Sequence, residues 1–163
     1  MRITSSFEYP AAPEQVFPMM TDPRFQAEKV EATHPLSHKE SVTPRGDTIE
    51  VVTSRLMPTD GFPEFARSMI GPKIRVTETI VWGQAAADGS RSGSLSIGIG
   101  DAPVSLTGTM RLTPSALGTR VDIDGELKAR VPLLGGRIEK AAEVPVRAAI
   151  DREHEVGVKW LTR

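Results

Sequence analysis

Two charged side chains occupy positions where the surrounding pattern calls for apolar ones. Glu78 shares the alternation of Val76 and Ile80 in a predicted strand, and Arg152 lies on or beside the inward stripe of a predicted C-terminal helix. A buried Glu or Arg is costly unless it is paired, so the two could form an ion pair or bind the polar head of a ligand. The alternative is that a bulge turns Glu78 to the sheet edge and that Arg152 extends to solvent.

Tyr9 and the three histidines are the other side chains that could do chemistry. Tyr9 has inward strand parity, so its hydroxyl would donate to a ligand carbonyl or to a backbone group. Histidine titrates near neutrality and could act as a general base, but His34 and His154 are expected at the solvated surface. With His38 they show no metal-ligand spacing, so the sequence predicts no metal site and no cofactor.

The composition excludes several classes of function. The chain has 163 residues, a formal net charge of −1 and no cysteine, which removes thiol catalysis, zinc knuckles and thiolate-held clusters. Near-neutral charge gives no electrostatic attraction to nucleic acid, and no apolar run is long enough for stable membrane insertion. We therefore expect one cytoplasmic domain over residues 1–163.

Periodicity predicts an α+β chain. Alternation and turn signals indicate an N-terminal strand, then two short helices, a meander of about six strands and a long C-terminal helix. The expected helices and strands before the insert are a strand over 2–9, short helices over 13–17 and 23–30, the second capped by Asp22, and a hairpin over 36–43 and 48–56. An insert with a short apolar helix follows over 57–72, then four further strands between 74 and 131, and the last helix over 135–160. The sheet would therefore be antiparallel, with about seven strands, and curled around the last helix.

Small residues suggest a cavity between sheet and helix. The helix stripe counted from Ile138 passes Ala142, Pro145 and Ala149, and the sheet contributes Gly98, Gly108 and Gly125. Alternatively these residues only allow close packing. The expected apolar contacts to a ligand are Val76, Ile80, Leu106, Met110, Ile123, Leu127 and Ala149. Phe62, Phe65 and Met69 of the insert would form a lid over the cavity or pack into the core.

The element order and one N-terminal motif resemble a known superfamily. Tyr9-Pro10-Ala11-Ala12-Pro13-Glu14-Gln15-Val16-Phe17 followed by Thr21-Asp22-Pro23 is similar to the START-like, SRPBCC or helix-grip superfamily, and the segment from Val131 to Lys140 resembles an uncharacterised bacterial branch of it. The resemblance spans the whole chain. It implies the helix-grip fold and a pocket for a hydrophobic ligand, but no particular reaction.

The leading hypothesis is a carrier or sensor that binds a small hydrophobic or lipid-like molecule, with Glu78, Arg152 or Tyr9 as polar contacts. A rival is a polyketide cyclase or dehydratase-like enzyme that uses the same pocket, with Glu78 or Tyr9 moving protons. A third is a co-chaperone-like protein-interaction module. No convergent nucleophile, base and oxyanion donors are evident, which favours binding over catalysis. The chain is expected to be a monomer or a weak homodimer.

Overall fold

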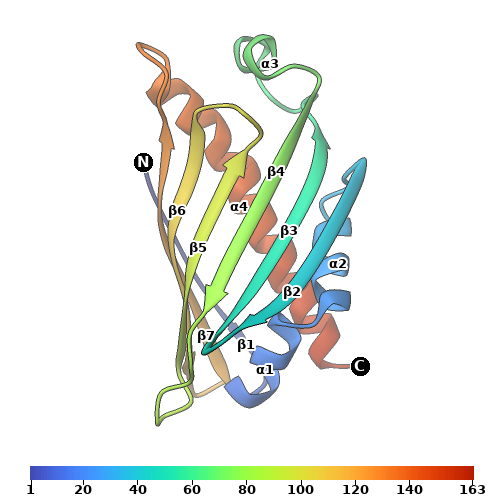
Figure 1. The fold of residues 1–163 in the computed structure, drawn as a ribbon, viewed down its shortest axis with the longest axis vertical. Coiled ribbons are helices and arrows are strands. Elements are labelled where there is room, and N and C mark those ends of the chain that lie inside the picture. The colour runs from blue at the N-terminus through green and yellow to red at the C-terminus, as the bar shows by residue number, and fades with distance from the viewer.

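The computed structural model describes all residues from 1 to 163 and confirms the predicted α+β architecture. A seven-stranded antiparallel sheet curls around one long C-terminal helix, and two short helices follow the first strand (Figure 1). In chain order the elements are β1 (Arg2–Tyr9), α1 (Pro13–Met20), α2 (Pro23–Glu31), β2 (Ser37–Arg45), β3 (Thr48–Pro58), α3 (Glu64–Ile70), β4 (Lys73–Trp82), β5 (Arg91–Ile99), β6 (Val104–Pro114), β7 (Thr119–Ala129) and α4 (Gly135–Leu161).

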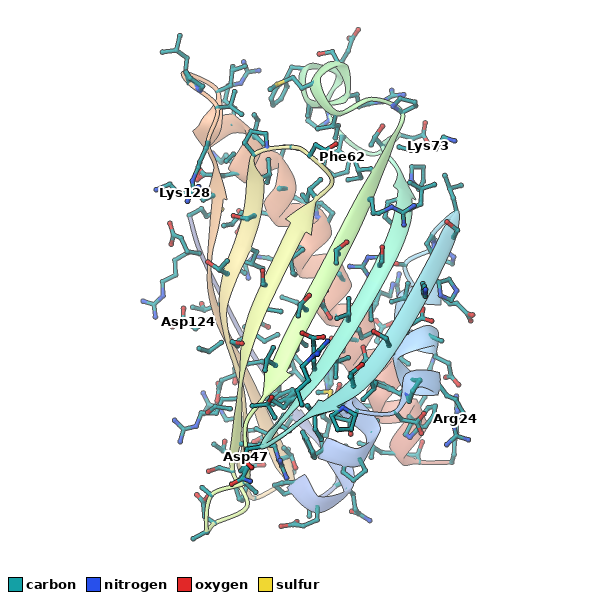
Figure 2. The ribbon with its side chains drawn as sticks, in the orientation of Figure 1. Arg24, Asp47, Phe62, Lys73, Asp124 and Lys128 are labelled. Atoms are coloured by element: carbon teal, nitrogen blue, oxygen red, sulfur yellow. The ribbon has the colours of Figure 1, made fainter.

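The sheet is a meander that the N-terminal strand completes. Its strand order is β1-β7-β6-β5-β4-β3-β2, so each strand from β2 to β7 pairs with the next one in the chain, with α3 inserted between β3 and β4, and β1 pairs with the last strand. The strand β7 shows why the register is well determined. Val121, Ile123 and Leu127 are buried, whereas the alternate residues face water, and Figure 2 shows Asp124 and Lys128 projecting from the outer face. A shift of one residue would bury those charges.

Local signals set the ends of the helices. Pro13 and Pro23 occupy the first positions of α1 and α2, where a missing N–H costs no hydrogen bond. The Asp22 carboxylate accepts from the backbone N–H of Arg24 at 2.8 Å and caps α2. Gly71 ends α3 with a φ of 82°, a conformation that favours glycine.

The helices lie at the two ends of the curled sheet. The helix α3 and the first turns of α4 lie at one end, and α1, α2 and the last turns of α4 lie at the other (Figure 1). Between them α4 crosses the concave face and packs against β1, β7 and α2. No helix combines the length and the apolar character that crossing a membrane requires.

The inward stripe of α4 differs from the predicted one. It runs through Ile138, Ala142, Val146, Ile150, Glu153 and Gly157. The predicted stripe went from Ala142 to Pro145, three residues on, whereas the buried face continues at Val146, four residues on. Because each residue turns the helix by about 100°, this difference moves the stripe to another side of the helix. Pro145 is consequently exposed and Ala149 lies only at the margin of the stripe. The middle of the helix therefore presents branched apolar side chains, not the small ones that suggested a central cavity.

Close packing, not cavity formation, explains two of the sheet glycines. Gly108 and Gly125 are partners in the β6–β7 register. A Cβ on Gly108 would collide with the backbone of Asp124, and a Cβ on Gly125 would stand 2.9 Å from the Leu106 side chain. Both positions need hydrogen in place of a side chain because neighbouring atoms approach the backbone closely here.

Tyr9 fixes α4 to the N-terminal strand. Its side chain is fully buried, and its hydroxyl donates to the backbone carbonyl of Glu153 at 3.3 Å. The ring lies against Gly157, where an added Cβ would collide with the ring carbons and the hydroxyl. Phe7 packs edge-on against the same ring, with centroids 5.4 Å apart. A rigid, enclosed ring leaves no space for a methyl group at Gly157.

We predict that Gly157→Ala destabilises the protein by about 1–3 kcal/mol through overpacking, although alanine is the better helix former. Gly136→Ala in the same helix is the matched control, because a Cβ there meets nothing within 4 Å. Urea unfolding of both variants measures the difference. Equal stability of the two variants would show that Tyr9 can move aside.

Candidate functional site

An apolar cavity of about 430 Å³ lies at the α3 end of the molecule. It is enclosed by α3, the starts of β4 and α4, and the β5–β6 connection. The lining residues are Phe62, Ala66, Met69, Ile70, Lys73, Ile74, Arg75, Ile99, Gly100, Asp101, Ala102, Pro103, Val104, Val131, Ile138, Ala141 and Ala142. Most of them are apolar, and the volume lies within the range of small-molecule sites.

The insert between β3 and β4 forms one wall of this cavity. Phe62 and Met69 line it, as the sequence predicted for a lid, and Figure 2 shows Phe62 beneath α3 at the same end as Lys73. Phe65 does not line it: its ring lies 4.3 Å below the Arg137 guanidinium. Two of the three predicted insert residues thus reach the cavity, and the third holds α3 to the start of α4.

The other predicted apolar contacts do not line this cavity. Five of them are buried in the main core: Ile80, Leu106, Met110, Ile123 and Leu127. Val76 faces the interior but lies beyond the cavity wall, and Ala149 is half-buried at the margin of the α4 stripe. Inward parity identified these side chains correctly, but parity does not distinguish a filled interior from an empty one.

A second feature of the interior is a buried ion cluster. Lys29 of α2 is 4% exposed, and its Nζ lies 2.6 Å from Glu78 Oε1 of β4 and 3.1 Å from Glu153 Oε2 of α4. Arg55 of β3 is also buried and faces the same interior, because its strand partner is Val76. Glu153 Oε1 has no hydrogen-bond partner. Three elements therefore meet at one ammonium group.

Of the two orientations that the sequence left open, Glu78 adopts the inward one, and its partner is Lys29 and not Arg152. Arg152 adopts the outward one: its side chain is exposed and pairs with Glu155 at 2.8 Å, so the ion pair between Glu78 and Arg152 does not form. The residue that faces inward is its neighbour Glu153, which follows Ile150 by three positions on the inner stripe.

The sequence carried signals for the residues that the prediction missed. Lys29 lies four positions after Phe25 on the buried face of α2, and Arg55 alternates with Val51 and Thr53 on β3. Both are long cations, which commonly extend to solvent from such positions. Their burial depends on the carboxylates that the fold places opposite Lys29.

The cluster pushes the pKa values of its two carboxyl groups apart. Burial favours neutral Glu78, but the charges of Lys29 and Arg55 outweigh it and lower the pKa of Glu78. Burial raises the pKa of Glu153; the charge of Lys29 opposes this shift and the repulsion from Glu78 adds to it, so the pKa stays above its ordinary value. Burial also opposes the charge on Lys29, yet the two carboxylates raise its pKa above the ordinary value. A carboxyl group with a lowered pKa beside one with a raised pKa is an arrangement suited to acid–base chemistry.

The groups around Tyr9 are structural. Burial and the charge of Glu153 raise the pKa of Tyr9, and its hydroxyl is already bonded to the main chain. His154, expected at the surface, is half-buried: its Nε2 lies 2.9 Å from the Glu8 carbonyl oxygen and its ring packs against Phe7. His34 is exposed as predicted. None of these three side chains lines the cavity.

The cavity and the ion cluster occupy successive positions along the interior. Ala142 at the cavity and Glu153 in the cluster are eleven residues apart (153 − 142), or about 16 Å along α4. Half-buried Val76 lies between them on β4, two residues from Ile74 of the cavity and two from Glu78. No group of His, Asp and Glu side chains converges in a way that could hold a metal ion.

We predict that Glu153→Gln gains stability relative to the wild type as the pH rises above about 4.5. Because the folded state raises the pKa of Glu153 above its ordinary value of 4.5, folded protein retains a proton that the unfolded chain has released. Wild-type stability therefore falls with increasing pH in that window, by at most about 1.4 kcal/mol per pH unit, and the glutamine removes this loss.

Chemical denaturation at a series of pH values measures the effect. Glu155→Gln, an exposed side chain on the same helix, controls for the loss of a carboxyl group. A stability difference between Glu153→Gln and wild type that stays constant with pH would contradict the raised pKa.

Comparisons with known proteins agree with this fold. The chain is 28% identical over 130 residues to the uncharacterized protein Rv0481c of Mycobacterium tuberculosis, which covers 76% of this chain and 74% of the relative. Three solved structures are similar in fold: TTHA0849 of Thermus thermophilus (TM-score 0.63, 16% identity, 98% of each chain), Ara h 8.0201 (0.60, 11%, 100% and 99%) and the Zhui aromatase/cyclase of Streptomyces sp. R1128 (0.52, 12%, 98% and 89%).

These low identities show the fold alone. The sequence model of one family matches residues 4–161, nearly the whole chain. The chain therefore belongs to the family described as protein of unknown function DUF2505.

Proposed function

We propose that this chain is a single START-like domain that binds a small hydrophobic or lipid-like molecule and serves as its carrier or sensor. The observation that carries the proposal is the cavity of about 430 Å³, of whose 17 lining residues 12 are apolar. Burying the apolar surface of a ligand there would supply the binding free energy. The ligand would be the partner of the protein, and no bound cofactor is needed for this role.

The helix α3 would control access. It is seven residues long, lies between Pro63 and Gly71, and only Ala66 of it is buried. Met69, which lines the cavity, is 46% exposed, so this wall is thin and partly in contact with solvent. A short helix with so few buried residues can open locally at low cost.

We predict that Ala141→Phe, which places a ring into the cavity, lowers the affinity for a hydrophobic fluorescent probe such as anilinonaphthalene sulfonate at least about tenfold, a loss of about 1.4 kcal/mol. Ala148→Phe is the matched control, since Ala148 is exposed on the same helix. Probe titration of the wild type and both variants gives the result.

Native mass spectrometry of protein purified from its own host tests the same proposal without a probe. A stoichiometric small molecule that extracts into organic solvent supports it. Wild-type protein that carries no such molecule and also fails to take up the probe contradicts it.

A second candidate is an enzyme of the cyclase or dehydratase kind. It is favoured by the opposite pKa shifts of Glu78 and Glu153, which suit a base and an acid, and the fold is shared with a protein titled aromatase/cyclase. Glu78 would accept the proton, because Tyr9 is bonded to the main chain. The co-chaperone-like alternative gains no comparable support, since the exposed large apolar side chains come from separate segments: Leu36, Met69, Leu117, Leu133 and Val144.

Under this second candidate, Glu78→Gln abolishes turnover of a linear poly-β-ketone thioester while probe binding survives; in a pure carrier it alters affinity only modestly. Glu155→Gln serves as the surface control. Product analysis by mass spectrometry decides between the two, and a wild-type protein that does not transform the thioester removes the support for the enzyme.

A further inference from the structure

Arg55 is a buried cation without a partner. Its side chain is 8% exposed, yet it takes part in no hydrogen bond and no carboxylate oxygen lies within ion-pair distance of it. The neighbouring cation is fully engaged, because Lys29 contacts both Glu78 and Glu153. Arg55 lowers the pKa of Glu78 and of Glu153 through its charge alone, because it forms no hydrogen bond with either carboxyl group.

The guanidinium of Arg55 is suited to binding an anion. It carries five N–H donors in a planar fork that matches a carboxylate or a phosphate. A ligand that covers these donors without bonding to them leaves them unsatisfied, at a cost in free energy. Unlike Trp82 Nε1, which is buried without a partner, the guanidinium nitrogens of Arg55 are not fully buried. The guanidinium therefore retains access to solvent.

The sheet register places Arg55 beside the cavity. The strand partner of Arg55 is Val76, and the partner of Val76 on the next strand is Ile99, which lines the cavity. Met57, two residues from Arg55, pairs with Ile74 of the cavity wall. Arg55 is therefore displaced by about 7 Å along the strand, at 3.3–3.4 Å per residue, from the row that forms the wall.

The side chains between the cavity and Arg55 do not seal the interior. Val76 and Ile99 face inward and both retain exposed surface, whereas Ile80 and Trp82, further along β4, are buried. On the other side of Arg55 lies His38, its partner on β2, whose ring contacts Glu40 and Glu31. The His38 ring is thus already paired with two carboxylates, whereas the Arg55 guanidinium next to the cavity has no partner.

We propose that Arg55 binds an anionic group, a carboxylate or a phosphate, of the amphipathic molecule whose apolar part occupies the cavity. This inference rests on the proposed binding function and specifies the class of ligand. The apolar portion contacts the cavity wall, and the anion accepts N–H bonds from the guanidinium. A neutral ligand of the same shape leaves these donors unsatisfied and binds more weakly.

Decanol, decanoate and decyl phosphate test the proposal because they share one apolar chain. The wild type is expected to bind at least one of the two anions about 10–100-fold more tightly than decanol, the range for hydrogen bonds to charged groups. Arg55→Gln is expected to reduce this ratio to about one while its affinity for decanol stays within about threefold. Arg45→Gln is the matched control: Arg45 lies in the same β2–β3 hairpin, is exposed, pairs with Glu50 and does not line the cavity.

Isothermal titration calorimetry supplies the affinities, and preference for decanoate or for decyl phosphate identifies the anion. A wild type that binds all three equally, or an Arg55→Gln variant that keeps the preference, overturns the inference and leaves the proposed function standing. A wild type that binds none of the three contradicts the proposed function itself.

A measurement on the wild type keeps the inference testable if Arg55→Gln does not fold. In protein with ¹⁵N-labelled arginine, the Nε–H resonance of Arg55, assigned with Arg55→Lys, should shift on addition of the preferred anion and not of decanol. The absence of such a shift at saturation overturns the inference.

Discussion

The contact of Lys29 with Glu78 and Glu153 holds α2, the sheet and α4 at a fixed spacing. Three titratable groups withdrawn from water are tolerated because Lys29 contacts both carboxyl groups, and removal of one partner from a buried ion pair costs about 3–5 kcal/mol. The cluster links side chains of α2, β4 and α4, and the rest of the interior lies on its two sides.

The two sides have opposite character. Toward α1, the inward residues Val51, Ile80 and Trp82 are buried in one continuous core. Toward α3, the inward residues Val76 and Ile99 keep exposed surface, and the cavity follows. The core nevertheless reaches the cavity, because Val104, Ile138 and Ala142 belong to the core and also line the cavity wall.

The sequence predicted the elements and their faces far better than the site. Strict alternation made the β7 strand and the inward position of Glu78 readable, because a half-buried strand has only two faces. The sequence analysis misplaced the inner face of α4 after Ala142. Successive residues on one face of a helix are three or four positions apart, and a step of three where the helix takes four put Arg152 on the inner face in place of Glu153. Lys29 and Arg55 could not be predicted from their own patterns, because long cations on an inner face usually extend to solvent. The cavity depends on how α3 folds back over the sheet, which no local pattern specifies.

The polar groups of the interior constrain what it can accept. The hydroxyl of Tyr9 is bonded to the Glu153 carbonyl, and Lys29 is shared by two carboxylates, so neither has a free donor for a ligand at this spacing. Arg55 is the cation that no carboxylate touches. A purely apolar molecule would gain from the cavity but would cover a guanidinium without satisfying it, and that penalty discriminates more sharply than an added or missing methylene group does. For the amphipathic ligand that we propose, specificity would depend less on the shape of the cavity than on the charge that lies beside it.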